Sequence, residues 1–189
     1  IDVELFEVYI DSEVDPILEI TGSDDIPVIE IRSGKSENNS LMIGKKSGSK
    51  QVSIRNTIAI GNNSLQNANV GGESVIIGVN AMQNSTVTSN NVAIGFEALK
   101  NTNTLGNTSV GCKALTKAIL AEANSAFGFL SLENLETGLN NIAVGFFSGQ
   151  GFKNGNNNTF LGTQSALILE NGERNVYVGA RNKSSSSNV

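Results

Sequence analysis

The sequence predicts an all-β protein built as a parallel β-solenoid. A glycine that follows an apolar residue returns at a nearly constant interval of 17 residues, which is the signature of a repeat architecture. The composition agrees, since the 189 residues include 20 glycines but only two prolines, and only 5% are aromatic. Such a chain favours many short strands and tight turns over a helical bundle. Its length is sufficient for one domain with a hydrophobic core.

Nine glycines mark the repeat. They are Gly44, Gly61, Gly78, Gly95, Gly111, Gly128, Gly145, Gly162 and Gly179. Successive members lie 17 residues apart, except for one interval of 16 between Gly95 and Gly111. This period is too short for a pair of helices but fits one coil of a solenoid, in which equal positions stack about 4.8 Å apart. Each glycine is expected to have a positive φ, or a close backbone approach that a Cβ would obstruct.

Apolar residues keep a fixed phase to these glycines. The residues one and three places before each glycine, such as Ile60 and Ile58 before Gly61, share one face of a strand and are expected to form internal ladders. The residue between them points the opposite way and is rarely charged, which predicts a face that packs against another subunit. This predicted interface face consists of Met42, Ala59, Ile76, Ala93, Ser109, Ala126, Ala143, Phe160 and Tyr177.

Asparagine recurs four places before the glycine in the last six repeats. These residues are Asn91, Asn107, Asn124, Asn141, Asn158 and Asn175, whereas the first three repeats have Ser40, Thr57 and Ser74 there. A carboxamide both donates and accepts hydrogen bonds. Stacked copies are therefore predicted to form a ladder in which each amide bonds to the coils above and below.

The chain divides into three parts by composition. Residues 1–38 are an acidic segment with short strands expected near 16–22 and 27–34, residues 39–183 are the repeat domain, and residues 184–189 are a flexible tail. The first segment is expected to cap the open edge of the stack or to join a preceding fibre portion. Its acidic stretch at 11–15, with Asp24 and Asp25 nearby, is either a solvated turn or a calcium site.

Three stretches of the repeat resemble a known motif. Residues 56–64 (NTIAIGNNS), 90–98 (NNVAIGFEA) and 140–148 (NNIAVGFFS) resemble the N-S-V-A-I-G-x-x-S head repeat of trimeric autotransporter adhesins, which also occurs in bacteriophage tail-fibre and related virion-fibre proteins. The resemblance covers about residues 39–183 and implies a left-handed β-roll assembled as a homotrimer. The longer returns, rich in Asn, Gly and Thr, are more similar to the phage version.

These observations favour a structural role. The leading hypothesis is a stiff trimeric rod in a bacteriophage tail fibre or related virion fibre, which supports host attachment. Its partners would be two further copies, neighbouring fibre proteins, and a host surface glycan or protein. The alternatives are the head of a bacterial trimeric autotransporter adhesin at the cell surface, and a polysaccharide-cleaving tailspike. Composition and hydropathy favour neither nucleic-acid binding nor membrane insertion.

Catalytic residues, metal ligands and cofactors are not expected. The chain has no histidine, and its single cysteine, Cys112, is interpreted as a structural residue without a base to activate it. Glu133 and Glu136 are the closest acidic pair of the repeats and are interpreted as solvated loop charges rather than a hydrolytic pair. Phenylalanines that follow the glycines predict packing at a coil edge or subunit interface, with glycan stacking as the alternative. These are Phe96, Phe129, Phe146 and Phe147.

Overall fold

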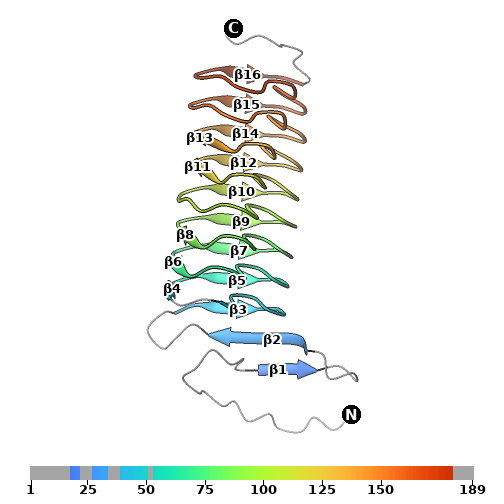
Figure 1. Cartoon of the computed structure of the whole chain (residues 1–189). Helices are drawn as coiled ribbons and strands as arrows, with labels where there is room; N and C mark the ends of the chain where they lie inside the picture. The colour runs from blue at the N-terminus through green and yellow to red at the C-terminus, as the bar shows by residue number, and fades with distance from the viewer. Residues whose placement is uncertain (1–17, 22–26, 34–38, 51–52, 181–189) are drawn as a thin grey trace.

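The protein is a rod of stacked coils (Figure 1). The computed structural model describes residues 18–21, 27–33, 39–50 and 53–180, and within these ranges the chain forms strands and turns but no helix. Strands of successive coils pair in parallel, for example Ile58 with Val75, at an offset of 17 residues. The prediction of an all-β parallel solenoid with 17-residue coils is therefore confirmed.

One sheet of eleven strands runs along the whole rod. Its strands, in spatial order, are β1 (Leu18–Thr21), β2 (Pro27–Ser33), β3 (Leu41–Ile43), β5 (Ile58–Ile60), β7 (Val75–Ile77), β9 (Val92–Ile94), β10 (Thr108–Val110), β12 (Ser125–Phe127), β14 (Ile142–Val144), β15 (Thr159–Leu161) and β16 (Val176–Val178). From β3 onward each strand has three residues, because the glycine that follows turns the chain out of the sheet.

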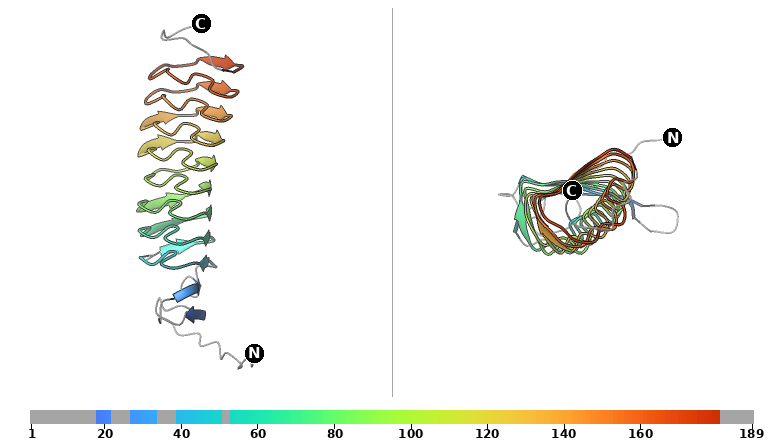
Figure 2. Two further views of the ribbon diagram at one scale, coloured as in Figure 1. Left: turned by 90° about the vertical axis from the view of Figure 1, so that its right-hand side faces the viewer. Right: turned by 90° about the horizontal axis from the view of Figure 1, so that it is seen from above.

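The return side of the coils carries two smaller sheets, which Figure 2 shows beside the long sheet. One contains β4 (Ser53–Arg55), β6 (Val70–Gly72) and β8 (Val87–Ser89), and the other contains β11 (Leu120–Glu122) and β13 (Thr137–Leu139). They are separated at the single 16-residue coil, where the ladder is reduced to a bridge between Ser89 and Leu105. The missing residue therefore shortens the return, while β9 and β10 keep full pairing in the long sheet.

The N-terminal strands close the lower end of the long sheet. β2 pairs antiparallel with β3, and β1 pairs antiparallel with β2. The backbone groups at the lower edge of the first coil are thus hydrogen-bonded to the hairpin, which is one established way of covering a sheet edge. The acidic stretches at 11–15 and 24–25 and the tail at 184–189 lie outside the described residues, so their assignments stay predictions.

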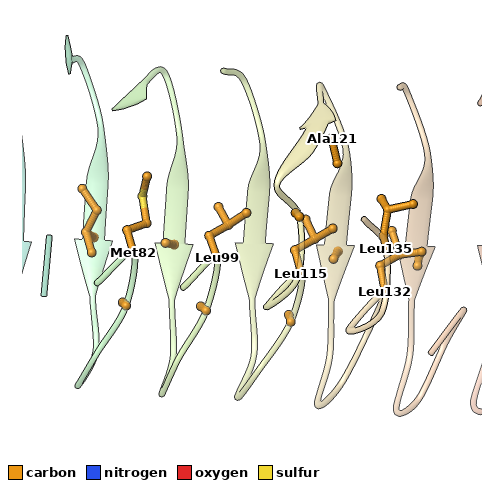
Figure 3. Close-up of a cluster of buried hydrophobic side chains, with 14 of the residues drawn as sticks. Met82, Leu99, Leu115, Ala121, Leu132 and Leu135 are labelled. Carbon is orange, nitrogen blue, oxygen red and sulfur yellow. The ribbon is translucent and has the colours of Figure 1, made fainter. Parts of the chain in front are cut away.

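The core is a narrow file of side chains between the strand and the return of each coil (Figure 3). Leucine or methionine four residues after the glycine fills much of it: Leu65, Met82, Leu99, Leu115 and Leu132 are fully buried. These five residues have φ between 48° and 52°, a conformation uncommon for bulky side chains. We infer that the burial of each side chain offsets this local strain, since burying a leucine contributes about 1.5–3 kcal/mol.

The middle residue of each three-residue strand also belongs to this core, which corrects the predicted interface face. Met42, Ala59, Ile76, Ala93, Ser109, Ala126, Ala143 and Phe160 have no exposed surface, and Tyr177 is 6% exposed. The chain itself covers them, so they cannot form a face for another subunit. The residues one and three places before the glycine point outward instead.

The reason is the small width of the coil, in which the two inner columns must share space. Where the strand centre is alanine, as at Ala59, the later position in the coil is a leucine, Leu65. Where the strand centre is large, as at Met42, that position is Gly48, at which an added Cβ would lie 2.9 Å from the Met42 sulfur. A large side chain in one column is thus matched by a small one in the other in these coils. Ile76 and Met82 are both large, and Ala143 and Gly149 are both small, so neighbouring coils also share the space, as Gly149 and the Phe160 ring do.

Candidate interaction surface

The outer side of the long sheet presents an apolar surface that the single chain does not cover. It consists of the two outward-facing columns: Leu41, Ile58, Val75, Val92, Thr108, Ser125, Ile142, Thr159 and Val176, and Ile43, Ile60, Ile77, Ile94, Val110, Phe127, Val144, Leu161 and Val178. We call these two columns the sheet face. Ile58 is 41% exposed and Leu161 is 45% exposed. Neither column contains a charged residue. Large continuous apolar surfaces of this kind mark interaction sites.

A third apolar column lies directly around the glycine turn from the sheet face. It contains Val79, Phe96, Cys112, Phe129 and Phe146, each of which follows a repeat glycine, and we call it the corner column. Four of these residues are exposed, and Cys112 is partly buried. The column is polar below this stretch, at Lys45 and Asn62, and above it, at Thr163.

Two phenylalanines of the corner column, Phe129 and Phe146, stack on each other. Their ring centroids lie 5.4 Å apart, with an angle of 15° between the rings. Phe146 also meets Phe147 edge to face, with ring centroids 4.2 Å apart. A sugar stacks on the face of an aromatic ring. The stacking of these rings on one another therefore favours packing against apolar side chains over binding of a glycan.

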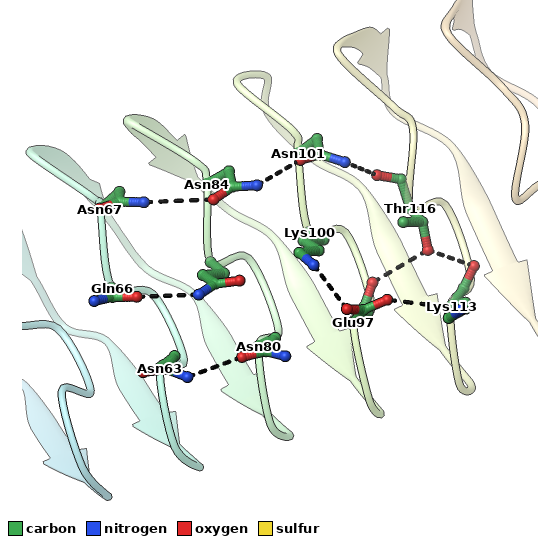
Figure 4. A network of polar contacts seen from close by, with 11 residues as sticks. Asn63, Gln66, Asn67, Asn80, Asn84, Glu97, Lys100, Asn101, Lys113 and Thr116 are labelled. Carbon is green, nitrogen blue, oxygen red and sulfur yellow. Dashed lines mark hydrogen bonds and ion pairs between the residues drawn. The ribbon is translucent and has the colours of Figure 1, made fainter.

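The next flank of the coil, beyond the corner column, is polar (Figure 4). Asn84 accepts a hydrogen bond from Asn67 at 3.4 Å and donates one to Asn101 at 2.8 Å. Glu97 forms an ion pair with Lys100 at 2.7 Å. Side chains that already bond to the coils above and below give this flank a regular polar surface, which suits contact with water.

The nine repeat glycines all have positive φ, between 115° and 146°. At Gly145 an added Cβ would lie 2.5 Å from the carbonyl oxygen of Gly162 in the next coil. Both the backbone conformation and the close stacking of successive turns therefore require glycine at this point. This geometry brings the carbonyl of each turn directly over the next and holds the coils in register.

The asparagines form a buried ladder inside the upper coils. The carboxamide oxygen of Asn124 accepts from the backbone N–H of Asn141 at 2.8 Å and from its side-chain amide at 2.9 Å. The same pattern repeats between Asn141 and Asn158, at 3.0 Å and 2.8 Å. The amide nitrogens of the ladder from Asn91 to Asn158 also donate across the coil, as from Asn141 to the carbonyl of Gly155 at 2.8 Å.

Serine hydroxyls stand in for the asparagine amides in the lower coils, and Ser74 performs only part of this task. The Ser74 hydroxyl accepts from the backbone N–H of Asn91 at 3.1 Å, as an asparagine oxygen would. The hydroxyl then donates locally to the carbonyl of Gly72 at 2.9 Å and not across the coil to the return of the next one. Ser40, by contrast, donates across its coil to the carbonyl of Ile54 at 3.4 Å, as the asparagines do. Backbone ladders on the return side, β4-β6-β8 and β11-β13, add further bonds in both halves of the rod.

A shallow groove lies on the return side of the upper coils. It is lined by Leu120, Thr137, Leu139, Asn154, Asn156, Asn171 and Glu173, over a floor of Gly138, Gly155 and Gly172. Its lining includes a single carboxylate, whereas glycoside hydrolysis ordinarily requires two. Of the predicted acidic pair, Glu133 accepts a hydrogen bond from Gln150 at 2.8 Å, and neither Glu133 nor Glu136 lines the groove.

Comparison of the chain with known protein families, with curated proteins and with solved structures finds no match. Among the described residues, no group of three or more His, Cys, Asp or Glu side chains is placed to hold a metal ion. The described part of the chain also forms no helix of the length and hydropathy that a membrane crossing needs. What the described residues show is an architecture, a β-solenoid whose sheet face is largely apolar and has no charged residue.

Proposed function

We propose that this protein is a rigid segment of a trimeric fibre, in which three parallel copies associate through the sheet face. The observation that carries the proposal is the length of that face. Two outward-facing columns, whose side chains are exposed or half-buried, pass through all nine coils without a charged residue. Leaving so much apolar surface in water is unfavourable, by about 25 cal/mol per Å².

The periodicity of the sheet face supports a second copy of the chain as its partner. Side chains repeat along it at the strand spacing of about 4.8 Å, over a length of about 40 Å. A partner must match this spacing throughout. Another copy that runs in the same direction does so, since rotation about an axis parallel to the rod places equal coils at equal heights. Threefold rather than twofold symmetry is what the resemblance to adhesin heads and phage fibres implies.

A rod of this kind is suited to a bacteriophage tail fibre or a related virion fibre. Backbone hydrogen bonds join each strand to the coils on both sides, for example from Gly61 to Ile43 and from Gly78 to Ile60, each at 2.8 Å. The turn glycines and the buried asparagines add further contacts between coils. The assembly would support host attachment by holding a binding element, which recognises a host glycan or protein, away from the particle.

Light scattering coupled to size-exclusion chromatography tests the assembly. The wild-type chain is expected to elute with three times the chain mass of 19.8 kDa. Replacing two sheet-face residues with Ile77→Glu/Val144→Glu should give monomers with an unchanged far-ultraviolet circular dichroism spectrum, because both side chains point outward. The matched control, Asn84→Glu/Asn134→Glu, adds the same charge on the polar flank, where both residues stand six places after a repeat glycine, and should remain trimeric. A monomeric wild-type protein would refute the proposal.

The head of a bacterial trimeric autotransporter adhesin is a second candidate. It is favoured by strands of the form apolar-Ala-apolar-Gly, as in Ile58–Gly61. Both candidates share the trimeric rod, so localisation must separate them. Immunogold electron microscopy with antibodies against this chain should label a fibre of purified virions. Labelling confined to the bacterial surface would favour the adhesin instead.

A further inference from the structure

A threefold ring needs two different patches on every subunit. Each subunit contacts one neighbour on its left and another on its right, and these contacts are heterologous, so patch p of one copy meets patch q of the next. The sheet face supplies one patch. Given the trimer proposed above, on which this inference rests, the structure should carry a second apolar patch beside it.

The size of the sheet face leads to the same expectation. A strand of three residues is about 10 Å long, and nine stacked strands are about 43 Å high. The flat area is therefore about 400 Å², roughly half of the ~800 Å² per partner that a stable interface usually buries. Additional apolar surface must come from a flank of the coil.

Two flanks carry exposed apolar residues. One is the corner column, and the other is a strip on the return side that contains Val70, Val87, Leu105, Leu120 and Leu139. The return strip is interrupted by charge, since the exposed side chain of Glu122 lies between Leu105 and Leu139 in the stack. Burying such a group without a partner is costly. The corner column has no charged residue from Val79 to Phe146.

The corner column is also in the right place. It adjoins the sheet face across the turn glycine, so the two patches meet at one corner of the coil, as two sides of a wedge do. Three wedges packed around an axis bring these corners together. Phe129 and Phe146 are stacked on each other and are 41% and 48% exposed, so their rings can pack against the side chains of an apolar sheet.

We propose that the corner column is the second patch of the trimer: in each copy it packs against the sheet face of the next copy, close to the threefold axis. The side chains of Val79, Phe96, Phe129 and Phe146 would contact the outward isoleucines and valines of the neighbour. The contact would be confined to the five coils in which the column is apolar.

Cysteine accessibility tests this arrangement with a matched pair of positions. Val79, in the corner column, and Val87, in the return strip, are each 43% exposed in the single chain. Each is replaced by cysteine in a Cys112→Ser background, and the rate of maleimide labelling is measured on the native protein. We expect Val79→Cys to react severalfold more slowly than Val87→Cys. Addition of Ile77→Glu/Val144→Glu, which dissociates the copies, should make the two rates equal.

The outcomes are separated by mass, measured on the same samples. Equal labelling rates in a protein of trimer mass would overturn the inference but not the trimer. Slower labelling at Val87→Cys would also overturn it, because the second patch would then be the return strip. A rate difference that persists in the dissociated variant would also overturn it, because the fold alone would then protect position 79. A wild-type monomer would refute the proposed function itself.

Discussion

The buried asparagine ladder should contribute strongly to stability, and Asn141→Ala tests it. This side chain has no exposed surface, and it joins three parts of the structure. Its oxygen accepts the backbone N–H of Asn158 at 3.0 Å, and its amide donates to the carbonyl of Gly155 at 2.8 Å. Alanine removes both contacts and leaves that N–H and that carbonyl without these partners.

The expected loss follows from those two groups. A buried polar group without a partner costs about 1–3 kcal/mol, so the variant should lose about 2–6 kcal/mol of unfolding free energy. The backbone N–H of residue 141 still donates to Asn124, and the Asn158 amide keeps the carbonyl of Gly172 at 2.9 Å, so neither adds to the loss. For a chain of this size the loss corresponds to a melting temperature lower by about 5–20 °C.

Two companion variants make the measurement specific. Asn141→Ser should lose about half as much, since a hydroxyl at this position can accept the N–H of the next coil, as Ser74 does for Asn91 at 3.1 Å. Asn84→Ala removes an exposed amide from the outer ladder and should change the free energy by less than about 0.5 kcal/mol. Thermal unfolding is followed by circular dichroism at equal protein concentration. A melting temperature of Asn141→Ala within a degree of wild type, or an equal loss in Asn84→Ala, would contradict the reasoning.

Further variants test the turns and the core by the same measurement. Gly145→Ala should lower the free energy of unfolding by about 3 kcal/mol or more, because the new Cβ meets the next turn at an unfavourable φ. Gly106→Ala should lower it by only about 1–2 kcal/mol, since no atom lies nearer than 3.9 Å to the new Cβ. Equal losses would show that stacking of the turns is unimportant. Phe160→Ala should cost about 3–5 kcal/mol, since its buried ring contacts Phe152 at a centroid distance of 5.1 Å. Gly149→Ala, whose Cβ would lie 2.6 Å from the Phe160 ring, should be more costly in wild type than in Phe160→Ala, and additive costs would contradict this packing.

The solenoid was predictable because its signals are local and repeated. A glycine at constant spacing fixes where every turn falls, and the apolar residues before it place the strands, so both strand position and parallel register follow from the sequence. The ladder of asparagines follows in the same way. The interruption of the return sheets was predictable from the 16-residue interval only as a shortened loop.

The inward and outward faces could not be assigned from apolar character alone, because both faces of these strands are apolar. The assumption that larger residues such as Ile58 and Ile60 point inward reversed the two faces. A size relation held part of the missing information, since Met42 is followed six residues later by Gly48, whereas Ala59 is followed by Leu65. Ile76 with Met82 and Ala143 with Gly149 do not follow this relation. Paired volumes of this kind identify side chains that share a small interior. The corner column needed the structure, because its exposure depends on where the turn directs each side chain.

The stacking of coils along one axis also determines how the rod would respond to force. A pull on the two ends acts along the hydrogen bonds between coils, so an end coil can peel away while those below remain folded. Each released coil of 17 residues would add about 56–61 Å of extended chain in place of one strand spacing of about 4.8 Å. A single detached copy should therefore lengthen in equal increments of about 5 nm. In a trimer associated through the sheet face, three coils would have to detach in each step, so the unfolding force would be higher.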